Sequence, residues 1–172
     1  MVCATLIDEM GIEKPNCLPS ELLSNPVFVL GRLGYGLKRQ AAEELEDAGF
    51  SLYDYSVLAL LTSGPCATQA TIATMLELDR SQLVGLLDSL EQRGLVERRR
   101  DQDDRRRHTV LLTDEGTRQL AHIRAIINGL ADEFLAPLDE QERATLHELL
   151  LRVASHHDAR FAQPQETTAG VS

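Results

Sequence analysis

Residues 68–113 read TQATIATMLELDRSQLVGLLDSLEQRGLVERRRDQDDRRRHTVLLT, and this stretch decides the fold. In its first half, Thr68 can cap a short helix, and a second helix follows the polar turn at residues 77–79. The second helix carries an apolar stripe at i, i+3, i+4 and i+7, made of Leu83, Leu86, Leu87 and Leu90. Gly94 is typical of a helix end. Two helices joined by a short turn are therefore predicted.

In the second half of the stretch, the spacing of the apolar residues is no longer helical. Residues 95–100 alternate weakly, residues 101–104 are turn-forming, and residues 108–112 are apolar and partly β-branched. Two short strands around a polar loop are predicted. A helix pair followed at once by a hairpin is typical of a winged helix-turn-helix, in which the second helix lies in the major groove of DNA. The arginines of the hairpin suit the adjacent minor groove, where the potential is most negative.

Helical periodicity continues on both sides of this stretch. Long helices are predicted at residues 25–48, 114–135 and 140–160, and a shorter one at residues 52–63. Adjacent aliphatic pairs such as Ile126-Ile127 and Leu149-Leu150 widen the apolar stripes beyond one face. Because a single lobe of this size cannot cover so much apolar surface, we expect these helices to pack against a second copy of the chain.

The expected fold class is mainly α with a small β-hairpin wing. The predicted organisation is an N-terminal arm (1–21), a helical dimerisation region (22–50 and 114–160), a winged helix-turn-helix lobe (51–113) and a disordered tail (161–172). The arm shows little periodicity, so it is expected to be loose or a short packed segment, and no function follows from it.

Charge is distributed unevenly along the chain. The net charge is −10, yet residues 80–107 hold eight basic and six acidic residues, or +2, while the remainder holds nine and twenty-one, or −12. Six of the fifteen arginines fall within residues 98–107. A local basic cluster in an acidic chain indicates an anionic partner at that place. An arginine run by itself is more often a solvated surface, so its position directly after the helix pair carries the argument.

Several other classes of protein are disfavoured. No apolar run is long enough to cross a bilayer and the start of the chain lacks the basic region of a secretory signal, so a cytoplasmic protein is expected. No phosphate loop, nucleophile elbow or dinucleotide fingerprint indicates an enzyme or a cofactor.

No metal site is expected at His156, His157 and Asp158, because neighbouring residues on a helix point in different directions. Cys3, Cys17 and Cys66 are too widely spaced to predict a disulfide framework.

The quoted stretch resembles the winged-helix core of the multiple antibiotic resistance regulator (MarR) family. The specific part is the wing signature of aspartate, any residue, arginine, five residues, leucine and threonine, met by Asp104, Arg106, Leu112 and Thr113. Flanking helix lengths extend the resemblance over about residues 22–160. It implies an obligate homodimer, formed by the first and the last two long helices, that binds a pseudo-palindromic double-stranded DNA operator. The two half-sites would lie about one helical turn, roughly 10 bp, apart.

Candidate DNA contacts come from two sources. The first is the recognition helix predicted at residues 80–93, called the reading helix below, and the second is the resemblance. The first turn of that helix carries Arg80, Ser81 and Gln82, of which Gln82 can pair with adenine and Arg80 with guanine or phosphate. The resemblance implies that Arg106 enters the minor groove and that Asp104 braces the wing. It also implies backbone contacts from Thr68 and Gln69, and phosphate contacts from some wing arginines, among them Arg98, Arg100 and Arg105. Val84 stands where the family often has a polar residue, and can meet a thymine methyl.

The resemblance further implies control by a small anionic or aromatic effector, and a repressor is the expected form of regulation. Arg32 is the candidate anion-binding residue, because it interrupts an apolar helix beside small glycines. Tyr35 and Tyr55, with Tyr53, are candidates to line the pocket, although core packing accounts for tyrosines equally well. Arg32 can also extend to solvent or pair with an acid of the second copy.

Two alternatives stay open from the sequence. A helical dimeric interaction or architectural module with non-specific DNA binding is compatible with the few polar residues on the reading helix. A thiol-based redox sensor would use Cys17 or Cys66, although an isolated cysteine is more often inert packing.

Overall fold

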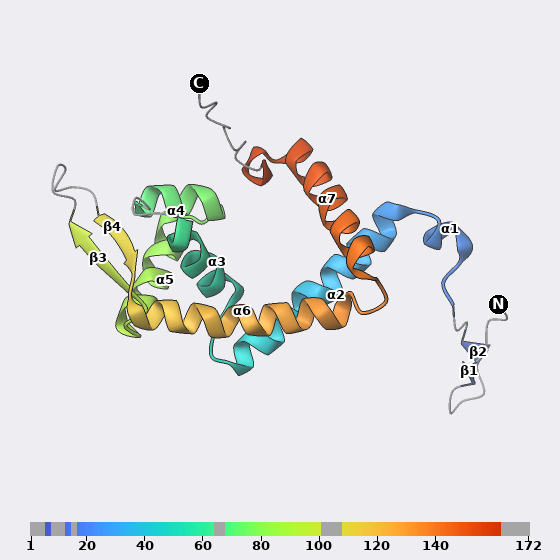
Figure 1. Cartoon of the computed structure of the whole chain (residues 1–172), viewed down its shortest axis with the longest axis horizontal. Helices are drawn as coiled ribbons and strands as arrows, with labels where there is room; N and C mark the ends of the chain where they lie inside the picture. Colours follow the sequence, from blue (N-terminus) through green and yellow to red (C-terminus); the bar gives the residue numbers. More distant parts are fainter. Residues whose placement is uncertain (1–5, 8–12, 15–16, 64–67, 101–107, 163–172) are drawn as a thin grey trace, which may run out of the picture. The chain divides into compact units, whose positions relative to one another are not determined.

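The computed structural model describes residues 6–7, 13–14, 17–63, 68–100 and 108–162 (Figure 1). The chain divides into two compact units, Met1–Glu44 and Leu45–Ser172. The two units are described separately below.

The first unit contains a short element that the sequence did not predict. Strand β1 (Leu6–Ile7) pairs antiparallel with β2 (Glu13–Lys14), and a single-turn helix, α1 (Ser20–Leu23), follows. Two-residue strands are too short to show a period of two, which is why the arm gave no strand signal. Cys17 is disulfide-bonded. The spacing of the cysteines did not predict this bond, because sequence spacing does not reveal which thiols meet in space.

Helix α2 (Pro26–Asp47) confirms the long helix predicted at residues 25–48. At its start the Asn25 side-chain oxygen accepts a hydrogen bond from the backbone N–H of Val27 at 2.9 Å, which supplies an N-terminal cap. Just beyond its end Gly49 has a φ of +79°, in the left-handed region that ends helices and favours glycine.

The second unit contains the predicted winged lobe and the two later long helices. In chain order it comprises α3 (Leu52–Leu60), a 3-10 turn η1 (Leu61–Ser63), α4 (Gln69–Leu76), α5 (Arg80–Gln92), β3 (Val96–Arg100), β4 (His108–Leu112), α6 (Asp114–Phe134), α7 (Glu140–His157) and a 3-10 turn η2 (Ala159–Phe161). The strands pair antiparallel, from Val96 opposite Leu112 to Arg100 opposite His108. The mainly helical fold with one hairpin wing is confirmed.

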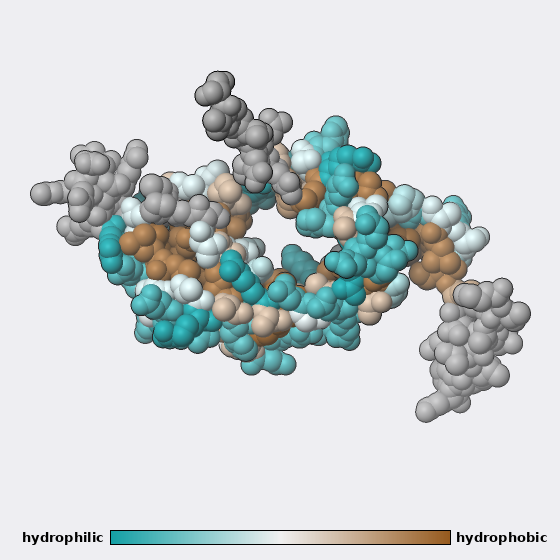
Figure 2. All heavy atoms as spheres, viewed as in Figure 1, coloured by the Kyte–Doolittle hydropathy of each residue, from teal (hydrophilic) through white to brown (hydrophobic). Residues whose placement is uncertain are grey.

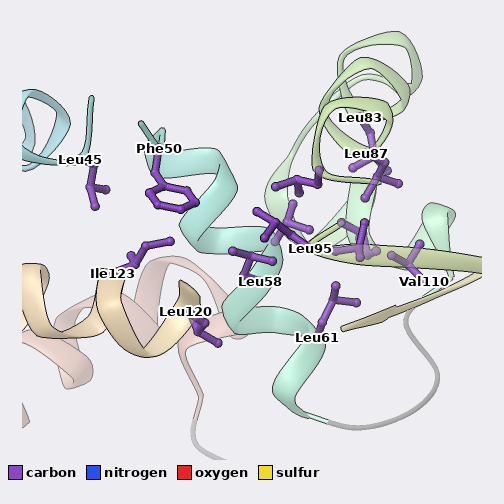
Figure 3. Close-up of a cluster of buried hydrophobic side chains, with 14 residues drawn as sticks. Leu45, Phe50, Leu58, Leu61, Leu83, Leu87, Leu95, Val110, Leu120 and Ile123 are labelled. Carbon is purple, nitrogen blue, oxygen red and sulfur yellow. The ribbon is translucent and has the colours of Figure 1, made fainter. Parts of the chain in front are cut away.

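One apolar core holds the lobe together. Among the described residues it comprises fourteen buried side chains: Leu45, Phe50, Val57, Leu58, Leu61, Ile72, Leu83, Leu87, Leu90, Leu95, Val96, Val110, Leu120 and Ile123. Figure 3 shows Leu58 of α3 among core side chains from α5, α6 and the hairpin. Burying each large aliphatic side chain stabilises the fold by about 1.5–3 kcal/mol. Leu83, Leu87 and Leu90 belong to the stripe predicted for the reading helix, so that stripe positions α5.

The base of the wing is joined tightly to the start of α6. The Thr113 hydroxyl donates to the carbonyl of Gly94 at 2.7 Å and accepts from the N–H of Gly116 at 2.9 Å, so it caps α6 and ties it to the end of α5. A Cβ added to Gly116 would lie 2.0 Å from the carbonyl oxygen of Leu95. Glycine is therefore required at this helix–strand contact.

Helix α7, unlike the helices of the lobe, has no buried face in the single chain. It follows the cap Asp139 and starts where the helix at residues 140–160 was predicted to start, but none of its residues, all of which the structure describes, is buried. Leu149, Leu150 and Val153 stay 43%, 41% and 53% exposed, and apolar side chains reach the surface along this helix in Figure 2. Nothing in the described residues of a single chain covers this face. No helix in the described part of the chain combines the length and apolar character needed to cross a membrane.

Candidate nucleic-acid interface

Helix α4 begins with a side-chain cap that also lies beside the hairpin. The Thr68 hydroxyl accepts from the N–H of Thr71 at 3.1 Å, and the backbone of Thr68 pairs with Thr109 of β4 in an isolated antiparallel bridge. Gln69 is the first residue of the helix. The two residues predicted to contact the DNA backbone therefore lie at the N-terminus of α4, where helix N–H groups favour an anion.

Asp79 is the N-terminal cap of helix α5, and its carboxylate organises the first turn. One oxygen, Oδ1, accepts from the N–H of Ser81 at 2.8 Å and from the N–H of Gln82 at 2.9 Å. The Ser81 hydroxyl donates to the same oxygen at 2.6 Å. These hydrogen bonds, led by that from the Ser81 side chain, hold the pKa of Asp79 below its ordinary value. The cap is thus a carboxylate at neutral pH, and it fixes the start of α5.

The same cap occupies part of the predicted reading surface. The side-chain oxygen of Gln82 closes the capping box by accepting a long, 3.4 Å hydrogen bond from the N–H of Asp79. The amide N–H groups of the Gln82 side chain take no part in this box. Arg80, Ser81 and Gln82 are exposed and Val84 is half-buried. No hydrogen bond or ion pair joins the Arg80 side chain to any described residue. Among the described residues, the donors of the Arg80 side chain therefore remain available for a ligand, as do the amide N–H groups of Gln82.

Arg98 of β3 is held by two carboxylates of α5. Its Nη2 donates to Glu91 Oε2 at 2.6 Å and also to Asp88, while its backbone N–H donates to Glu91 Oε1 at 3.0 Å. The Arg98 side chain, ahead of its backbone N–H, holds the pKa of Glu91 below its usual range. Because its charge is already partnered, this arginine braces the wing against α5, which argues against a free phosphate contact.

The other predicted wing residues are described only in part. Arg99 is exposed and paired with Glu97 on the same strand, and Arg100 is the last residue of β3. Asp104, Arg105 and Arg106 lie outside the described residues, so the predicted minor-groove contact and its brace stay predictions.

Sequence reasoning missed Arg93, which fixes the far end of α5. Its Nη2 donates to the carbonyl of Gly49 at 3.0 Å, its guanidinium lies 4.5 Å from the Phe50 ring centre, and it pairs with Asp54 at 3.6 Å. Asp54 in turn caps α3 by accepting from the N–H of Ser51 at 2.8 Å. The capping boxes of Ser51 and Asp79 carry a sequence signal, a polar cap followed three residues later by an acid or amide, whereas the contacts of Arg93 carry none.

The candidate effector residues lie in different units. Arg32 and Tyr35 are exposed on α2 within the first unit, whereas Tyr55 of α3 is half-buried against the lobe core. A Cβ placed on Gly31, Gly34 or Gly36 meets nothing within 4 Å, so each of these three positions faces open space in the single chain. Cys66 lies outside the described residues. No group of three potential ligands among the described side chains is placed to hold a metal ion.

Comparison with known proteins agrees with this geometry. The model of the MarR family matches residues 50–108. The chain is 32% identical over 117 residues to a transcriptional regulatory protein for the hcr operon of Thauera aromatica, covering 68% of this chain and 66% of that protein. It is 31% identical over 144 residues to the regulator PecS of Dickeya dadantii, covering 76% and 82%.

Solved structures agree in fold. The repressor CouR bound to a 23-mer DNA duplex matches with a TM-score of 0.70 and 30% identity, over 80% of this chain and 98% of that one. CouR from Rhodococcus jostii RHA1 bound to p-coumaroyl-CoA matches with a TM-score of 0.67 and 28% identity, over 83% and 98%.

A reading helix followed by an arginine-rich hairpin defines the class as winged helix-turn-helix DNA-binding proteins. Within that class, the chain belongs to the MarR family of transcriptional regulators.

Proposed function

We propose that this protein is a homodimeric, ligand-responsive repressor that binds a pseudo-palindromic DNA operator. The observation that carries the proposal is that α5, whose first turn is exposed, is joined through Arg98, Glu91 and Asp88 to a hairpin whose described strands carry three of the six clustered arginines. The DNA-bound structure of CouR supports operator binding as the use of this surface. Phosphate contacts supply affinity in such interfaces, and the helix supplies sequence preference.

Different residues are proposed to contact different parts of the DNA. Arg80, Ser81, Gln82 and Val84 face base edges, while Thr68, Gln69, Arg100 and Arg105 contact the backbone. Arg106 enters the minor groove and Asp104 braces the wing loop. Arg98 braces the base of the wing through Glu91 and Asp88, as its hydrogen bonds support.

A second copy of the chain is the proposed cover for the apolar faces outside the lobe. On α7 this face comprises Leu149, Leu150 and Val153, and on α2 it includes Val27, Leu30 and Leu33. The proposed dimerisation region is residues 22–50 and 114–160, the DNA-binding lobe is residues 51–113, and the arm and tail are residues 1–21 and 161–172. Burying such faces in a symmetric interface removes the cost of their exposure.

The effector is proposed to be a small anionic or aromatic molecule. The structure of CouR with p-coumaroyl-CoA supports this chemical class. The open space around Gly31, Gly34 and Gly36 supports a role for Arg32, with Tyr35 and Tyr55 as further candidates. An effector changes DNA affinity only through its different affinities for the DNA-bound and free conformations.

The protein is further proposed to act in the cytoplasm and to have no enzymatic activity. Its membership of a family of transcriptional regulators supports both statements.

Selection of bound sequences from a random duplex pool, at one stated moderate salt concentration, tests the proposal. We expect a pseudo-palindrome with half-sites about 10 bp apart. Arg106→Ala should then weaken binding to the selected operator about 10-fold or more while the dimer persists, because a minor-groove arginine is lost. Arg152→Ala on α7 removes the same charge outside the wing and should bind normally. Salt-sensitive binding without a consensus would instead identify an architectural module.

A further inference from the structure

Arg160 of η2 contacts the turn of the helix-turn-helix. Its Nη1 donates to the carbonyl of Met75 at 3.2 Å, and its Nη2 donates to Glu77 Oε1 at 2.6 Å. Met75 lies in the last turn of α4, where a helix leaves carbonyls without partners of its own. The contact spans more than eighty residues of sequence and joins the C-terminal end of the last long helix to the DNA-binding lobe.

On its own side, Arg160 is fixed to the end of α7. The N–H of Asp158 donates to the carbonyl of Ala154 at 2.8 Å, so Asp158 belongs to the last turn of that helix. The Arg160 Nε lies 2.9 Å from both carboxylate oxygens of Asp158, and Nη2 also donates to this carboxylate. The guanidinium thus contacts two carboxylates, of Asp158 and Glu77, and the carbonyl of Met75. The contact with Asp158, at the end of α7, sets the direction in which the Arg160 side chain points.

On the other side, the contacted turn sets the start of α5. Glu77 adopts a left-handed conformation with a φ of +53°, an arrangement that costs a non-glycine residue free energy and has to be held by its surroundings. Two residues further on, Asp79 caps α5, and Arg80 follows directly. A displacement of the turn therefore moves the residues proposed to read DNA.

We propose that Arg160 is a positioning residue for operator binding: it ties the turn between α4 and α5 to the end of α7 and thereby sets where the reading helix lies. The proposal rests on the proposed function, since it concerns how that function is achieved. Because α7 carries the apolar face assigned to the dimer interface, the tie links the position of each reading helix to the arrangement of the two subunits.

The link between α7 and the turn is polar. A cleft of about 500 Å³ lies beside it, lined by Ser56, Ala59, Leu60, Met75, Leu76, Arg160 and Phe161. Close apolar packing therefore does not fill the space between the end of α7 and the turn, and the guanidinium contacts of Arg160 join the two. Arg160 also has its donors directed at protein groups, so it is not a phosphate contact, and its loss should leave the salt dependence of DNA binding unchanged.

The test compares Arg160→Gln, Arg160→Lys and Glu77→Gln with wild type on the operator recovered by selection and on the same operator with one base pair inserted between half-sites. We expect Arg160→Gln to weaken operator binding about 5-fold and to reduce the preference for the native spacing by a similar factor. Arg160→Lys should be intermediate, since an ammonium cannot reach all three partners. The double variant Glu77→Gln/Arg160→Gln should resemble Arg160→Gln alone.

Arg152→Gln is the matched control, because it removes the same charge from α7 and, in the described part of the chain, has no side-chain polar contact. Thermal melts and sedimentation establish that each variant stays folded and dimeric. If Arg160→Gln proves unstable, Glu77→Gln, which removes a single carboxylate contact, tests the proposal instead. Its operator affinity and its preference for the native spacing are then measured. Unchanged affinity and spacing preference would overturn the proposal, and so would a shallower salt dependence. Failure of the wild type to select any consensus would instead overturn the proposed function.

Discussion

The winged lobe and helix α7 reach their structures by different means. The lobe contributes ten of the fourteen described side chains in the apolar core, and side-chain caps close the starts of its helices. Helix α7 has a good cap and no buried residue, and its apolar side chains stay exposed. The lobe thus has an apolar core within one chain, while the apolar face of α7 is left for the proposed second copy to cover. The following substitutions test this difference, from the largest expected effect to the smallest.

Gly116→Ala should damage the lobe most. The new Cβ would meet the backbone oxygen of Leu95 at 2.0 Å, and backbone at the base of a hairpin cannot move aside easily. We expect the free energy of unfolding to fall by about 3 kcal/mol and the melting temperature by about 10 °C, measured by circular dichroism. Gly129→Ala in the same helix meets nothing within 4 Å and should stabilise by up to about 1 kcal/mol. Equal melting temperatures for the two variants would contradict the close contact.

Leu150→Glu should separate the two subunits while leaving the lobe folded. A carboxylate buried in an apolar interface is costly, so the dissociation constant of the dimer should rise about 100-fold or more, as measured by sedimentation equilibrium. Gln141→Glu adds the same charge at the exposed start of α7 and should leave the dimer intact. A dimer of unchanged affinity in Leu150→Glu would show that this face is not the interface.

Thr113→Ala should lower the free energy of unfolding by about 1–2 kcal/mol, because the α6 cap and the bond to Gly94 are both lost. Thr113→Ser keeps the hydroxyl and should retain most of the stability. Thr145→Ala removes a hydroxyl from exposed α7, where it donates to the carbonyl of Gln141 in the same helix, and should change stability little. Urea denaturation of the three variants measures the difference, and equal losses at Thr113 and Thr145 would contradict it.

Glu91→Gln should have the smallest effect, and one that depends on pH. Because Arg98 lowers the pKa of Glu91 in the folded state, the carboxylate stabilises the fold above the ordinary glutamate pKa of about 4.3. That contribution is lost as the pH falls through the lowered value. We expect wild type to melt slightly above Glu91→Gln at pH 7, and the two to converge near pH 3. Glu148→Gln on exposed α7 is the control. A difference that grows in acid would refute this role of the pair.

Much of the lobe was predictable from its residues. The Leu83, Leu87 and Leu90 repeat, the turn before Arg80 and the two strands around a polar loop follow from local periodicity, and periodicity reflects which side chains one face must bury. The long helices were predicted for the same reason, and the residues at their starts, Thr113 and Asp139, are types that favour helix caps. The hairpin of β1 and β2 was not, because two-residue strands carry no repeat.

Sequence by itself determined the order of the elements from residue 25 onward, the arginine-rich hairpin after the reading helix and hence the class of the protein. Only the tertiary structure decided which charged groups meet. Arg98 is paired with α5, Arg93 joins the far end of α5 to the start of α3, and Arg160 reaches the turn before α5. Helix and strand patterns depend on neighbours a few residues apart, whereas the partner of a charge depends on how distant elements pack, which no local pattern encodes.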